Sequence, residues 1–214
     1  MTQRAMVVVN GDDVDHDLLT AAHVFAQLGV EAGFATRGAM GTSRFVDPLP
    51  ATADADAYLL YTAGGQFTIP QQRALADAVA AGKGLLGVHT ANLLGPEGGP
   101  LAELLGGSTA THGTGGRATV EIIARHPITE GVGDFAVFDD VADVEPAGDV
   151  TVLARFDGRP ALYTREVGAG RVTYLALGHD MRSWGEPAVR TLVRQALLWV
   201  TDRTREDTCR RTSA

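Results

Sequence analysis

Cysteine is almost absent from this sequence, and its scarcity excludes several kinds of chemistry. The single cysteine, Cys209, lies in a polar C-terminal stretch. One cysteine cannot form an internal disulfide, so a reducing, cytoplasmic environment is expected. A cysteine nucleophile in the core is excluded as well, because no core segment carries a thiol.

Long apolar runs and excess positive charge are also lacking. No stretch approaches the roughly 18 apolar residues of a membrane helix, and the first apolar run, Ala5–Val9, is too short for a signal-peptide core. The formal net charge is −8. Because nucleic acids and anionic membranes both attract clustered Lys and Arg, neither is an expected partner.

The motifs that most directly identify a reaction are missing. There is no G-x-G-x-x-G after the first apolar run, no Walker lysine motif and no G-x-S-x-G elbow. Neither C-x-x-C nor H-E-x-x-H occurs. A hypothesis about function must therefore come from residues that are distant in the sequence.

What the sequence does contain is an alternation of strands and helices. The 214 residues, 45% of them hydrophobic and 21% charged, fit one globular domain. Apolar runs at Ala5–Asn10, Ala57–Thr62 and Gly84–His89 are typical of strands covered on both faces. His16–Leu28 has helical spacing, and Val30–Thr36 is interpreted as a second strand. This alternation predicts a doubly wound, mostly parallel sheet.

The second half of the chain has a different pattern. Val150–Phe156, Ala161–Glu166 and Arg171–Leu177 follow one another as strands, separated by glycine-containing turns. Added antiparallel strands are therefore predicted, before a closing helix at Pro187–Val200. We expect one domain over residues 1–200 and a disordered polar tail over 201–214.

Polar residues recur where these strands end, which is where open α/β sheets bind ligands. The candidates are His16, Tyr61, His89, Thr90, His112, Asp139, Asp140 and His179. Histidines with a carboxylate can act as general acid and base, or bind a divalent transition metal such as zinc, and the spacing does not choose between these roles. The alternative is structural: His89 and His179 would be hydrogen-bonded turn residues, and His112 an ordinary residue of a glycine-rich loop. His126 precedes Pro127 and is interpreted as structural, and His23 as an ordinary helix residue.

Several segments together resemble the ThuA-like family, named for trehalose utilisation. They are Asp15–Asp17, Gly82–Ala91, Leu105–Gly107, His126–Phe135 and Gly168–Pro187, so the resemblance covers nearly the whole chain except the tail. It implies a flavodoxin-like, class I glutamine amidotransferase-like fold. It also implies a context of disaccharide and modified-sugar catabolism, with a small carbohydrate as ligand, and it is compatible with a homodimer.

The resemblance implies a site and also two departures from the family pattern. True amidotransferases carry a cysteine on the sharp turn after a central strand, where this chain has His89 or Thr90. The family's Asp-Glu-Tyr stretch is replaced here by Asp139-Asp140-Val141-Ala142, which shortens the glutamate and removes the tyrosine.

Two hypotheses follow. In the first, the chain is an enzyme acting on a sugar derivative, with His89, His112, Asp140 and His179 catalytic and with His16, Tyr61, Thr90 and Trp184 binding the ligand. In the second, the chain is a non-catalytic binding or regulatory domain that keeps the pocket without the cysteine. An active glutamine amidotransferase is disfavoured, because Cys209 lies beyond the last helix.

Overall fold

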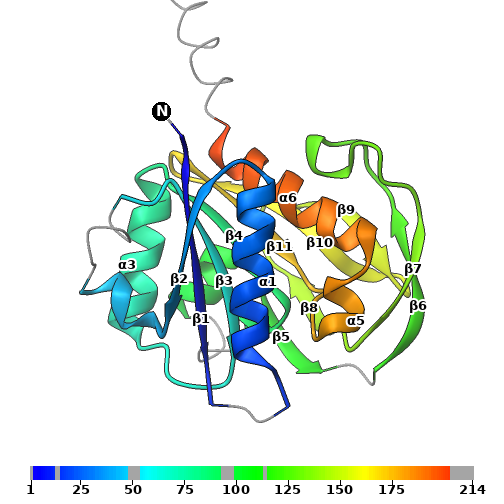
Figure 1. Cartoon of the computed structure of the whole chain (residues 1–214), viewed down its shortest axis with the longest axis horizontal. Coiled ribbons are helices and arrows are strands. Elements are labelled where there is room, and N and C mark those ends of the chain that lie inside the picture. Colours follow the sequence, from blue (N-terminus) through cyan, green and yellow to red (C-terminus); the bar gives the residue numbers. More distant parts are fainter. Residues whose placement is uncertain (1, 13–14, 48–53, 93–98, 113–114, 203–214) are drawn as a thin grey trace, which may run out of the picture.

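A nine-stranded mixed sheet forms the centre of the structure, a computed structural model that describes residues 2–12, 15–47, 54–92, 99–112 and 115–202 (Figure 1). The strand order is β2-β1-β3-β4-β11-β10-β9-β6-β7. The doubly wound sheet with added antiparallel strands is thereby confirmed. The proposed tail lies almost entirely outside the described residues.

The first five strands in this order are parallel. The strands are β2 (Ala35–Met40), β1 (Arg4–Gly11), β3 (Ala57–Ala63), β4 (Gly84–Val88) and β11 (Gly170–Leu175). Every residue of β3 and β4 is buried, as expected for strands covered on both faces. Because parallel strands share one direction, their carboxyl ends meet at one edge of the sheet.

The remaining four strands extend the sheet antiparallel. They are β10 (Arg159–Val167), β9 (Thr151–Phe156), β6 (Gly116–Ile122) and β7 (Phe135–Asp139). The turns at 157–158 and 168–169 join β9 to β10 and β10 to β11, and both predicted hairpins are confirmed. This extension brings β11 back beside β4, parallel to it.

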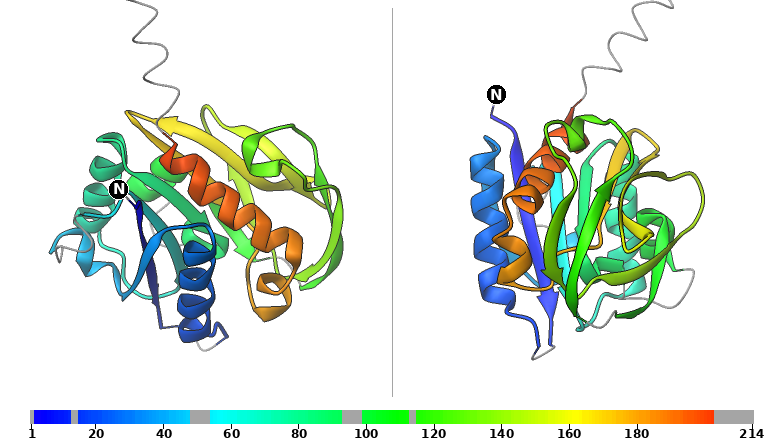
Figure 2. Two further views of the ribbon diagram at one scale, coloured as in Figure 1. Left: turned by 45° about the horizontal axis from the view of Figure 1, so that its top comes forward. Right: turned by 90° about the vertical axis from the view of Figure 1, so that its right-hand side faces the viewer.

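Helices cover both faces of the parallel half, which gives three layers (Figure 2). On one face, α1 (Leu18–Glu31) and α6 (Pro187–Thr201) pack against residues such as Val7 and Leu59. On the other, α3 (Ile69–Ala80) and α4 (Pro100–Leu105) pack against residues such as Val8 and Leu60. Alternate residues of one strand thus enter opposite cores. Among the residues that the structure describes, every helix is too short or too polar to span a bilayer.

Two predictions about secondary-structure elements need correction. The strand predicted at Val30–Thr36 begins later than expected, because α1 continues through Val30 to Glu31 and β2 starts only at Ala35. The exposed Val30 was mistaken for the start of a strand, whereas Gly33 (φ +90°) makes the turn. The predicted glycine-rich loop around His112 is instead strand β5 (Gly107–His112), which pairs with β8 (Ala142–Pro146) in a separate two-stranded sheet.

Candidate functional site

His89 lies at the carboxyl end of the central strand β4. Its φ of +53° is in the left-handed region, which non-glycine residues seldom adopt and which clusters at functional sites. The turn leads directly into the 3₁₀ helix η2 (His89–Asn92). Tyr174 donates a hydrogen bond to the His89 carbonyl oxygen, and Thr62 Oγ1 donates to the Thr90 carbonyl at 3.0 Å. Neighbouring strands therefore hold this unusual backbone in place.

His16 approaches from the segment between β1 and α1. The helix begins two residues later, and Asp17 caps it by accepting a hydrogen bond from the Thr20 N–H at 3.0 Å. The cap fixes the entry into the helix directly after His16. The His16 side chain is buried, with 8% of its surface exposed.

His179 follows β11 and precedes the short helix α5 (Met181–Trp184). Its main chain is held by Asp139, the last residue of β7. Asp139 accepts hydrogen bonds from the N–H groups of Gly178 (2.7 Å), His179 (3.0 Å) and Asp140 (2.9 Å), and from the Ser183 hydroxyl (2.7 Å). This carboxylate therefore positions His179 through its backbone.

Burial raises the pKa of Asp139, and the hydrogen bonds from Ser183, Gly178, His179 and Asp140 oppose that rise. The side chain is 2% exposed. A buried carboxyl with this many donors is expected to serve the structure of the loop rather than to meet a ligand.

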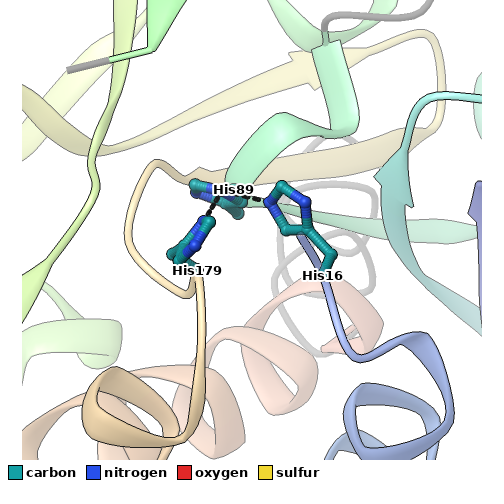
Figure 3. Close-up of side chains that lie close together, drawn as sticks. All are labelled: His16, His89 and His179. Carbon is teal, nitrogen blue, oxygen red and sulfur yellow. Dashed lines mark hydrogen bonds between the residues drawn. The ribbon is translucent and has the colours of Figure 1, made fainter. Parts of the chain in front are cut away.

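The rings of His16, His89 and His179 converge at the carboxyl edge of the sheet (Figure 3). His89 Nε2 lies 3.2 Å from His16 Nε2 and 3.2 Å from His179 Nδ1. One nitrogen from each ring lies within 4.8 Å of the other two. His89 is fully buried and His179 is only half-buried, so the cluster is approached from the His179 side.

Tyr61 and Trp184 lie behind the histidines. The Tyr61 hydroxyl donates to the His179 carbonyl at 3.1 Å, and Trp184 Nε1 donates to the Gly178 carbonyl at 2.7 Å. Both rings are buried and contact each other at 5.9 Å between centroids. In this conformation Tyr61 and Trp184 support the loop that carries His179. The buried Thr90 similarly supports the turn at His89.

Two further residues were predicted to be catalytic. The backbone of His112 ends β5, where it pairs with Ala142, and its side chain lies outside the part of the chain that the structure describes. Asp140 directly follows β7, and its buried Oδ1 has no hydrogen-bond partner among the described residues. The sequence indicated both members of the Asp139-Asp140 pair but could not show that Asp139 is the one that contacts the His179 loop.

The other histidines with described side chains are separate from the site. His126 Nδ1 accepts a hydrogen bond from the Ile128 N–H at 3.2 Å, and its ring packs edge-on against Trp199 at 5.0 Å between centroids. His23 is exposed on α1.

The open sheet, the left-handed turn after β4 and the histidine cluster at the carboxyl edge define a class I glutamine amidotransferase-like α/β fold. Within that class, the family model described as trehalose utilisation, ThuA, matches residues 4–200. The chain belongs to the ThuA family.

Solved structures agree with this fold. A putative ThuA-like protein from Parabacteroides merdae has a TM-score of 0.79 at 14% identity, over 94% of this chain and 90% of that chain. A second, from Bacteroides uniformis, has a TM-score of 0.76 at 17% identity, over 94% and 92%. A β-galactosidase from Bacillus circulans has a TM-score of 0.64 at 14% identity, over 95% of this chain but only 31% of that enzyme. No curated protein sequence matches the chain.

Proposed function

We propose that this protein is an enzyme acting on a sugar or sugar derivative, with His16, His89 and His179 at its reaction centre. The convergence of three imidazoles from separate strand ends carries the proposal. Grouping three such rings in a core has little structural benefit, since each must keep its polar nitrogens satisfied. Their position at the carboxyl edge of the parallel strands is where this type of sheet binds ligands.

The roles of the residues follow from their exposure. His179 is the most accessible of the three rings, so it would meet the substrate and transfer a proton. His89 contacts both other rings and would hold or relay that proton. Asp139, Tyr61 and Trp184 act as positioning residues, because each hydrogen-bonds to the backbone of Gly178 or His179.

A carbohydrate substrate is supported by the family rather than by a contact. The family model is described as trehalose utilisation, and similar folds occur within larger enzymes named as β-galactosidases. Proton transfer beside a keto group of an oxidised sugar and hydrolysis of a glycosidic bond are both reactions that histidine acid–base catalysis can serve.

The proposal can be tested by assaying the purified chain on disaccharides and on their oxidised, keto-bearing derivatives. His89→Ala and His179→Ala are expected to lower kcat/KM at least about 100-fold. His23→Ala removes an exposed histidine and is expected to leave the rate unchanged. Folded His89→Ala and His179→Ala variants with full activity would refute the assignment.

The same set of disaccharides and oxidised derivatives tests the alternative role as a non-catalytic binding domain. The absence of the amidotransferase cysteine favours that alternative. A sugar that raises the melting temperature of the chain but is never converted would replace the enzyme proposal with that role.

A further inference from the structure

We infer that the three histidines form a binding site for a divalent transition metal, with His16 Nε2, His89 Nε2 and His179 Nδ1 as ligands. The inference deepens the proposed function and rests on its assignment of the site, although it does not depend on a sugar being the substrate. The argument uses the distances between the nitrogens, the orientation of His89 and the way each ring is held.

The distances between the nitrogens match a shared ion. Zinc–nitrogen bonds of about 2.0–2.1 Å place two tetrahedral ligand atoms about 3.3–3.4 Å apart. Two of the three pairs are separated by 3.2 Å, and all three nitrogens lie within 4.8 Å of one another.

The orientation of His89 suits a metal ligand. Its Nδ1 lies 3.4 Å from the Ala176 carbonyl oxygen. A proton on Nδ1 points at this acceptor and leaves the lone pair on Nε2, the atom that both other rings approach. Metal-binding histidines commonly donate their second ring N–H to a carbonyl or carboxylate, which fixes the tautomer in this way.

Hydrogen bonding alone accounts less well for the cluster. A ring nitrogen has either one in-plane proton or one in-plane lone pair. His89 Nε2 therefore cannot form two well-directed hydrogen bonds, yet ring nitrogens of His16 and His179 approach it at the same distance. A cation placed between the rings would accept all three lone pairs.

The ligands are also held before any ion binds. The left-handed turn and the Tyr174 hydroxyl fix His89, the start of α1 fixes His16, and Asp139 fixes the backbone of His179. Since His89 and His16 are buried and His179 is half-buried, a fourth position would open on the His179 side. Three protein ligands with one open position is the arrangement of catalytic rather than structural zinc sites.

The donor chemistry restricts the ion. Three imidazoles favour Zn²⁺, Co²⁺, Ni²⁺ or Cu²⁺, whereas Ca²⁺ and Mg²⁺ prefer oxygen ligands. At this centre, such an ion would polarise a carbonyl oxygen or activate a water molecule. The ion would then take over the role assigned above to proton transfer through His89 and His179, because the ring nitrogens that ligate it cannot also carry a proton.

The experiment is a metal titration of the full-length, tag-free chain after chelator treatment. Zn²⁺ binding is followed by calorimetry, retained metal by elemental analysis, and Co²⁺ binding by its visible absorption. We expect one equivalent of Zn²⁺ per chain and an absorption spectrum typical of four-coordinate Co²⁺. His16→Gln, His89→Ala and His179→Gln should each weaken Zn²⁺ binding at least 100-fold.

Two controls separate this site from other binding. His23→Ala and Cys209→Ser remove the exposed histidine of α1 and the only thiol, and both should bind Zn²⁺ as the parent chain does. His179→Gln alters a half-buried ring and provides a folded test if His89→Ala fails to fold, as judged by circular dichroism. Unchanged Zn²⁺ affinity in folded His179→Gln, or no binding by the parent chain, would overturn the inference.

The outcome is independent of the activity assay. If the parent chain binds no metal but the histidine variants still lose turnover, the metal site is refuted while the proposed function stands on acid–base catalysis. If the metal binds and no sugar is converted, the metal site stands and the substrate assignment fails.

Discussion

Replacing Asp139 with alanine is expected to lower the free energy of unfolding by about 4 kcal/mol. The substitution removes the acceptor of hydrogen bonds from the Gly178 and His179 N–H groups and from the Ser183 hydroxyl. Each buried donor left without a partner costs roughly 1–3 kcal/mol. For a domain of this size, the melting temperature should fall by about 10 °C, which thermal unfolding followed by circular dichroism will measure.

Asp143→Ala is the matched control, because this aspartate forms a surface ion pair with Arg159 at 2.9 Å. Such pairs contribute less than about 1 kcal/mol, so the melting temperature should change little. Asp139→Asn keeps one acceptor oxygen, so its melting temperature is expected to lie between those of the Asp139→Ala and Asp143→Ala variants. Equal stability of the Asp139→Ala and Asp143→Ala variants would show that the four hydrogen bonds do not hold this loop.

The substitution Gly178→Ala is expected to have two large effects. It should lower the free energy of unfolding by about 3 kcal/mol, and it should displace His179. Gly178 has a φ of +120°, which residues with a Cβ rarely adopt. An added Cβ would also lie 2.9 Å from Cγ1 of Val88, the residue before His89. Thermal unfolding measures the first effect, and the Zn²⁺ titration or the sugar assay measures the second.

Gly133→Ala is the comparison for this substitution. The space around Gly133 is open, with no heavy atom within 4 Å of an ideal Cβ, and its φ is not positive. Its stability should therefore stay within about 0.5 kcal/mol of the parent chain. If Gly178→Ala behaves like Gly133→Ala, the turn before His179 is more adaptable than the structure indicates.

The central strands of the parallel half could be predicted because they are buried on both faces, unlike the exposed edge strand β2. Such strands appear in the sequence as continuous apolar runs, and the polar residues that end them are conspicuous. His16, His89 and His179 were found in this way. The sheet β5–β8 could not be predicted, since Gly107–His112 contains small and polar residues without apolar alternation.

The parts of the site that the sequence left open depend on contacts between distant segments. Asp139 and Asp140 are adjacent and chemically the same, and only the position of the His179 loop, about 40 residues later, distinguishes them. Tyr61 and Trp184 were expected to bind ligand because an aromatic ring or a hydroxyl can contact a sugar. The structure shows them packed under the loop, a difference that no local pattern encodes.

The separation of the three histidines along the chain links the site to folding itself. His89 is 73 residues from His16 and 90 residues from His179, so the cluster joins the first strand of the parallel sheet to its last. An ion held there would act as a crosslink that closes two long loops, and such closures restrict the unfolded chain most. A chain that ends before β11 would have only two of the three ligands, so the complete centre can form only once the whole sheet has assembled.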